Sequence, residues 1–117
     1  MNRVHLPDRR QNRTHEITAY GGRWRVCVGY DGAGRAREVF MDGERVGSDV
    51  AQLLSDACVA ISVALQHGVP AAEMGASCGT VPVAGAAEVT EPASALGAVL
   101  AMLVAEDADI ARIGGAP

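Results

Sequence analysis

Four side chains near the start of the sequence are of types that bind phosphate. Arg9, Arg10, Arg13 and His15 fall within one short polar segment. The arginine guanidinium presents a planar fork of N–H donors that matches the oxygens of a phosphate group. The pattern predicts a nucleotide- or phosphate-contacting arm that uses Arg9, Arg10 and Arg13. The competing interpretation is a solvated arm whose arginines pair with acidic side chains of the same chain.

Thiol chemistry has three candidates, Cys27, Cys58 and Cys78. Their spacing fits neither a C-x-x-C redox pair nor a zinc site, so we predict free thiols and no metal. Cys58 falls in an apolar segment and is typical of a small core residue. Cys78 falls in a glycine-rich segment and is either an inert thiol or a redox-active one. The odd cysteine count and the polar start predict a cytoplasmic protein.

Two further segments could support catalysis but have simpler interpretations. His67 follows an apolar helical segment, where an imidazole can cap the last carbonyl groups. A small thiol enzyme that uses Cys78 and His67 remains the alternative, although it would also need an orienting acid. The run from Asp31 to Gly34 lacks the Gly-Lys-Ser/Thr ending of a P-loop and predicts a hairpin turn. We therefore assign no catalytic residue and no cofactor.

The elements that must position these side chains follow an α+β order. We expect a three-stranded antiparallel β-sheet followed by one long and one or two shorter helices. The strands are expected at Ile17–Tyr20, Arg23–Tyr30 and Arg35–Met41. A chain of 117 residues is long enough for one core. The expected divisions are an extended arm at 1–15, a single domain at 16–110 and a flexible tail at 111–117.

The helices are marked by capping residues and by stops. Ser48 can cap a long helix that runs to His67, and Gly68 can end it in a left-handed turn. A short helix is expected near Pro70. A last helix is expected over 92–105, starting at about Pro92 and capped by Thr90 or Glu91. Residues 75–90 show no clear period.

Charge is unevenly distributed along the chain. Through Arg45, nine arginines oppose six acids, whereas from Val46 onward one arginine opposes eight acids, in agreement with the formal net charge of −4. We favour attraction between a basic sheet and acidic helix ends over an anion-binding surface. A net acidic chain argues against non-specific nucleic-acid binding. No apolar run approaches the ~20 residues of a membrane span, so no membrane association is expected.

Several segments, taken in order, resemble one known family. They are Leu6-Pro7-Asp8-Arg9-Arg10, Asp31 to Phe40, Gly47-Ser48-Asp49, Ala64 to Pro70, and Glu91 to Gly97. This order resembles the TSCPD domain near the C-terminus of adenosylcobalamin-dependent (class II) ribonucleotide reductases, which also occurs as a small stand-alone protein. The resemblance spans about Leu6 to Leu103. The Thr-Ser-Cys-Pro-Asp motif itself is absent, since Ala76 to Thr80 keeps only Ser77-Cys78.

The resemblance implies a link to deoxyribonucleotide synthesis without a complete reductase. In those enzymes the radical cysteine, the reducing cysteine pair and the cobalamin site belong to a large barrel, which does not map onto this chain. We therefore expect an accessory module that packs against a reductase catalytic subunit or against itself. A purely structural homodimer is a further alternative.

Self-association is expected because two helical segments are apolar around most of their circumference. A single sheet face cannot cover both, and a two-fold dimer would bury the rest. The variants Val99→Glu and Leu103→Glu are expected to break such a dimer. The competing interpretation is that residues 75–90 fold back as a cover and keep the chain monomeric.

Overall fold

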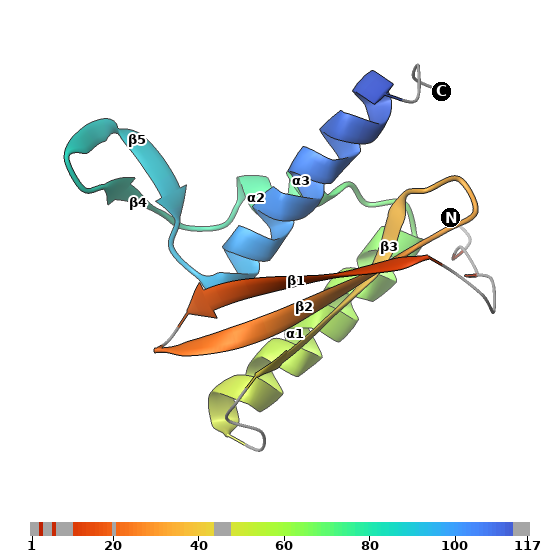
Figure 1. The fold of residues 1–117 in the computed structure, drawn as a ribbon, viewed down its shortest axis with the longest axis horizontal. Helices are drawn as coiled ribbons and strands as arrows, with labels where there is room; N and C mark the ends of the chain where they lie inside the picture. Colours follow the sequence, from red (N-terminus) through yellow and green to blue (C-terminus); the bar gives the residue numbers. More distant parts are fainter. Residues whose placement is uncertain (1–2, 4–5, 7–10, 20, 44–47, 114–117) are drawn as a thin grey trace.

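The computed structural model describes residues 3, 6, 11–19, 21–43 and 48–113 of the chain. It confirms the predicted α+β fold, and it adds a second, smaller sheet (Figure 1). The elements are β1 (Asn12–Ala19), β2 (Gly22–Tyr30), β3 (Ala36–Gly43), α1 (Asp49–Gln66), α2 (Ala71–Ala76), β4 (Thr80–Val83), β5 (Ala86–Pro92) and α3 (Ala95–Ile113).

The first sheet is antiparallel in the order β1-β2-β3, and its two faces differ sharply. On the inner face, Val26 and Val28 of β2 lie opposite Met41 and Val39 of β3, and all four are buried. On the other face, Phe40 is exposed. On β3, period-two alternation therefore aims Val39 and Met41 at the core and Phe40 at solvent.

The turn between β2 and β3 is the predicted hairpin turn, and Asp31 fixes it. Its Oδ1 accepts hydrogen bonds from the backbone N–H groups of Ala33 (2.9 Å) and Arg35 (3.1 Å). A side chain that binds the backbone two residues on is typical of Asx turns. The P-loop interpretation is therefore excluded for this segment, which joins two strands.

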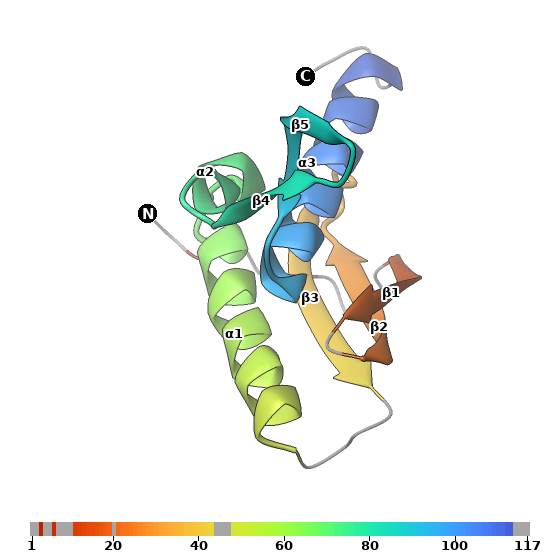
Figure 2. The ribbon, with the colours of Figure 1, turned by 90° about the vertical axis from the view of Figure 1, so that its left-hand side faces the viewer.

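Helix α1 begins and ends where the sequence predicts. The Ser48 hydroxyl accepts the Ala51 N–H at 3.1 Å, and Gly68 follows the helix with a φ of 89°. Four apolar side chains of α1, at helical spacing, face the core: Leu54, Cys58, Ile61 and Leu65. The helix runs along the sheet beside β3 (Figure 2). By length and composition alone α1 could cross a membrane, a test that core helices of soluble proteins also pass.

Two polar side chains of α1 bind the outer backbone edge of β3. The Ser62 hydroxyl accepts the Val39 N–H at 2.9 Å and donates to the Val39 carbonyl at 3.1 Å. The Gln66 amide donates to the Arg37 carbonyl at 3.1 Å. Among the described residues no strand pairs with this edge of β3, so Ser62 and Gln66 satisfy backbone groups that burial would otherwise leave unpaired.

Helix α3 begins later than predicted. Thr90, Glu91 and Pro92 belong to β5, and Ser94 is the capping residue: its hydroxyl accepts the Gly97 N–H at 3.0 Å. The prediction was wrong because proline suits the first turn of a helix as well as the end of an edge strand. The helix also extends past Ala105, as far as Ile113.

Residues 75–90, which show no period in the sequence, contain the end of α2 and most of a hairpin. Strands β4 and β5 pair antiparallel around Gly85, which has a φ of 78°. The hairpin projects away from the first sheet and from α1 (Figure 1). It does not cover α1, so the competing interpretation, in which residues 75–90 cover the apolar helices, does not hold for α1.

Exposed apolar surface was expected on both long helices, and the structure distributes it differently. Val99 and Leu103 of α3 are fully buried in the core, so a glutamate at either position would disrupt folding rather than report on a dimer. On α1, by contrast, Leu53 is 69% exposed and Val59 is 53% exposed. The exposed apolar surface predicted from the sequence is therefore found on α1.

Candidate functional site

Three hydrogen-bond donors from the first sheet converge on one carboxylate of α3. The Tyr30 hydroxyl donates to Glu106 Oε2 at 2.7 Å, and His15 Nε2 lies 3.2 Å from Oε1. The nearest guanidinium nitrogen of Arg13 lies 4.0 Å from the same Oε1. The Glu106 side chain is only 13% exposed, so these contacts replace much of its hydration. We call Arg13, His15, Tyr30 and Glu106 the Glu106 cluster.

Strand register brings the donors of the cluster together. Arg13 pairs with Val28 and His15 with Val26, so both side chains leave β1 on the core side of the sheet. Tyr30 lies at the end of β2, after a register shift at Gly29. Tyr30 is buried and His15 half-buried, whereas the Arg13 side chain is 71% exposed. The cluster is therefore buried at Tyr30, and its solvent-exposed rim is formed by the positively charged Arg13.

Burial and the acids of α3 shift the pKa values of Tyr30 and of Asp107, the residue after Glu106. Burial, together with the hydrogen bond to Glu106, raises the pKa of Tyr30 well above its ordinary value. The phenol therefore stays a neutral donor at physiological pH. Burial also raises the pKa of Asp107, the next residue on α3, and the nearby charge of Glu106 acts in the same direction, opposed by Arg35.

A second ionic contact lies at the neighbouring β2–β3 turn. Arg37 Nε donates to Asp31 Oδ2 at 2.8 Å, and Arg37 Nη1 donates to the Leu65 carbonyl at 2.7 Å. Burial alone would raise the pKa of Asp31, but the Arg37 hydrogen bond and the backbone N–H groups of Arg35 and Ala33 together lower it. This contact ties the turn to the end of α1 and is structural.

The predicted phosphate-binding residues are only partly placed. Arg9 and Arg10 lie outside the described residues, and Arg13 belongs to the Glu106 cluster. Arg13 has an acidic neighbour of the same chain, as the competing interpretation expected, yet most of its side chain remains in solvent. Tyr30 and Glu106 were not anticipated, because 76 residues separate them in the sequence and no local motif links them.

The candidates for thiol chemistry lie apart from this cluster. Cys58 is buried, and burial raises the pKa of its thiol to about 11. Cys78 is half-buried and lines a hollow of about 320 Å³ between α2, α3 and the base of the β4–β5 hairpin. His67 Nδ1 donates to the Val63 carbonyl at 2.9 Å, which confirms its capping role. The lining of the Cys78 hollow does not include His67, and the described residues contain no candidate metal-binding group.

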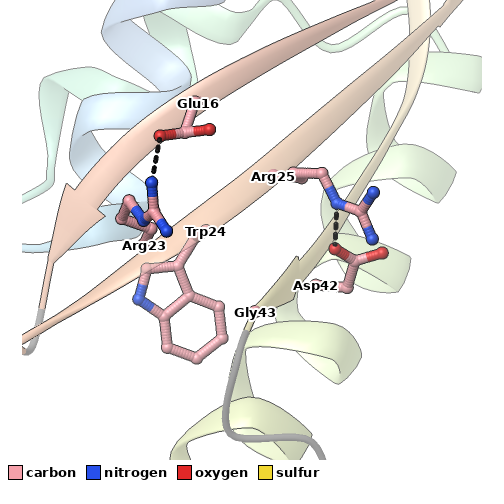
Figure 3. A pocket seen from close by; sticks show the side chains of 6 residues that line it. All are labelled: Glu16, Arg23, Trp24, Arg25, Asp42 and Gly43. Carbon is pink, nitrogen blue, oxygen red and sulfur yellow. Dashed lines mark hydrogen bonds and ion pairs between the residues drawn. The ribbon is translucent and has the colours of Figure 1, made fainter.

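A second hollow, of about 260 Å³, lies beside the β1–β2 hairpin (Figure 3). Its polar side chains are already paired: Arg25 donates to Asp42 at 3.1 Å, and Arg23 lies 3.9 Å from Glu16. Trp24 also lines the hollow, and its indole donates to the Ala19 carbonyl at 2.9 Å. Both arginines of this hollow lie beside acids on the exposed face of the sheet, so their charges are already balanced.

Comparison with known proteins points to one family. The family model of the TSCPD domain matches residues 2–106. The vitamin B12-dependent ribonucleotide reductase of Rhodopirellula baltica is 37% identical over 68 residues, which is 58% of this chain and 6% of that protein. The reductase of the same name from Agrobacterium fabrum is 37% identical over 71 residues, 61% of this chain and 6% of that protein. No solved structure matches.

Proposed function

Because this chain belongs to the TSCPD domain family, we propose that it is an accessory module of ribonucleotide reduction and not a complete reductase. The observation that carries the proposal is the family match over residues 2–106, together with two relatives that are vitamin B12-dependent ribonucleotide reductases. The chain spans 6% of the length of those relatives, so the radical chemistry is assigned to a partner. The proposal assigns no catalytic residue to this chain.

The partner surface in this proposal is the outer side of α1. Leu53 and Val59 are exposed there, on the side of the helix opposite its buried stripe, although large apolar side chains are more often buried. The partner is a reductase catalytic subunit, and a second copy of the chain is the competing occupant. Either one would remove the same apolar area from water.

Affinity capture tests this surface. The tagged chain is expected to retain a reductase subunit from the native host, and Leu53→Glu is expected to abolish the retention. Thr90→Glu is the control, because it adds the same charge at an exposed position of β5, in the hairpin that projects away from α1. Retention that is unaffected by Leu53→Glu would contradict the proposed surface. Light scattering of the purified chain would show a dimer mass if a second copy binds there.

The nucleotide contact in this proposal is the arginine-rich segment Arg9, Arg10 and Arg13. Support comes from the donor geometry of arginine and from the solvent exposure of Arg13. A hydrogen bond to a charged group contributes about 1.5–3 kcal/mol, so Arg10→Ala should weaken binding about tenfold or more.

Calorimetry with ATP, dATP and GTP measures this effect. The control is Arg25→Ala, which removes an arginine on the opposite face of the sheet and should leave the affinity unchanged. No heat at millimolar nucleotide would remove the nucleotide contact. That result would not bear on the reductase association, which the affinity-capture experiment tests separately.

The thiol-enzyme alternative has less support. The Nδ1 atom of His67 is hydrogen-bonded to the Val63 carbonyl, and the thiol of Cys78 donates to the Met74 carbonyl at 3.6 Å. A general base needs a nucleophile within hydrogen-bond reach.

A further inference from the structure

The Glu106 cluster has the donor set of an anion site. An arginine, a histidine and a tyrosine hydroxyl from two adjacent strands surround one negatively charged group. Charge-assisted bonds from such donors are the ones that hold phosphate and carboxylate groups in proteins. In this fold the negative group comes from the chain itself.

We infer that Glu106 is an internal occupant of an anion site formed by Arg13, His15 and Tyr30, and that a nucleotide phosphate binds there by displacing it. The inference rests on the proposed nucleotide contact and deepens it, because it adds His15 and Tyr30 to the predicted Arg13. It also gives Glu106 a regulatory role: its carboxylate competes with the ligand.

Exposure of the cluster makes this exchange physically feasible. Arg13 is largely in solvent and His15 is 31% exposed, so a phosphate can approach from the rim without opening the core. The flexible Glu106 side chain can swing out by side-chain rotation, with α3 left in place. The buried Tyr30 hydroxyl then offers its proton to the incoming phosphate oxygen.

The charges around the cluster predict a weak wild-type site. Glu106 and the neighbouring Asp107 repel an approaching phosphate, and Glu106 already takes up the donors. Arg13, His15 and Tyr30 would contact phosphate oxygens and would make no contact with the nucleotide base. Affinity should therefore rise with the charge of the phosphate chain and differ little between ATP and GTP.

Glu106→Gln is the decisive variant. Glutamine keeps the size of the side chain, and its amide oxygen can still accept from Tyr30 or His15, so the helix stays attached. Only the negative charge is lost. Affinity for ATP should increase about tenfold, which is the change that one unit charge a few Å away makes to an ionisation equilibrium. Glu91→Gln removes the same charge from an exposed position of β5 and should change affinity less than twofold.

Calorimetry with ATP and with inorganic phosphate gives the readout, and thermal unfolding confirms that each variant is folded. Arg13→Ala, an exposed substitution, provides a second test if Glu106→Gln fails to fold, and it should weaken ATP binding about tenfold. Equal ATP affinity in the wild type and in Glu106→Gln would overturn the inference and leave the arm contact standing. Loss of binding in Arg10→Ala with no effect of Arg13→Ala would also overturn it. No binding by any variant would remove both phosphate proposals and leave the capture experiment as the test of the reductase association.

Discussion

The two sheets of this chain use the same antiparallel pairing and have opposite relations to solvent. The first sheet places Val26, Val28 and Val39 beneath α1 and α3 in one buried cluster. The β4–β5 hairpin leaves Val81 and Val89 exposed, and outside the hairpin the main contact of β5 is with α3. An isolated two-stranded hairpin is marginally stable in water. The comparison teaches that burial, and not strand pairing, separates the stable part of this molecule from the weakly held part.

The largest expected effect comes from the core that covers the first sheet. Leu103 is fully buried, so Leu103→Ala should lower the free energy of unfolding by about 2–5 kcal/mol, through lost apolar burial and the cavity that remains. Urea denaturation monitored by circular dichroism measures this change. A loss below about 1 kcal/mol would mean that α3 contributes little to the core.

An intermediate effect is expected at the turn of the first sheet. Asp31→Asn should lower stability at pH 7 by about 1–3 kcal/mol, because Arg37 loses its charged partner. The folded-state pKa of Asp31 lies below the unfolded value of about 3.9. The wild-type advantage should therefore be fully present at neutral pH and decline as pH falls below about 4 through the folded pKa.

Unfolding measured between pH 7 and pH 2 tests the pH dependence of this contact. Asp42→Asn is the control, because Asp42 and Arg25 form an exposed ion pair that should contribute about 0–1 kcal/mol. A wild-type advantage over Asp31→Asn that persists unchanged at pH 2 would contradict the ionic explanation.

The smallest effect is expected in the second sheet. Val89 is 54% exposed, so Val89→Thr should change the free energy of unfolding by less than about 0.5 kcal/mol. Amide hydrogen exchange should also be faster in β4 and β5 than in β2, because the hairpin has few buried apolar contacts. A destabilisation of more than about 1 kcal/mol would show that a second molecule covers the hairpin in solution.

The sequence predicts the elements whose signals are local. Ser48 and Gly68 mark the two ends of α1, and Asp31 marks the hairpin turn; each acts through its own backbone or through neighbours within four residues. The start of α3 was misplaced because Pro92 and Ser94 are both acceptable near a helix start. Only the pairing of β4 with β5 decides between them.

The candidate site shows where such prediction ends. Contacts among His15, Tyr30 and Glu106 form only after β1 has paired with β2 and α3 has packed on the sheet. Neither the residue types nor their spacing in the sequence predicts these contacts. The buried stripe of α3 was equally hidden. A helix that is apolar nearly all round does not reveal which stripe faces the core, so Val99 and Leu103 could be mistaken for surface residues.

The hydrogen bonds of Ser62 and Gln66 have a consequence for aggregation. An edge strand normally offers its free N–H and C=O groups to any incoming strand. Both backbone groups of Val39 and the carbonyl of Arg37 are already bound to side chains of α1, so a foreign strand would first have to displace Ser62 and Gln66. A further strand can therefore add to one edge of this sheet more easily than to the other. Of its two edges, the one at β3 is blocked along this stretch by the chain's own helix, and β1 is the edge that strand exchange or fibril formation would have to use.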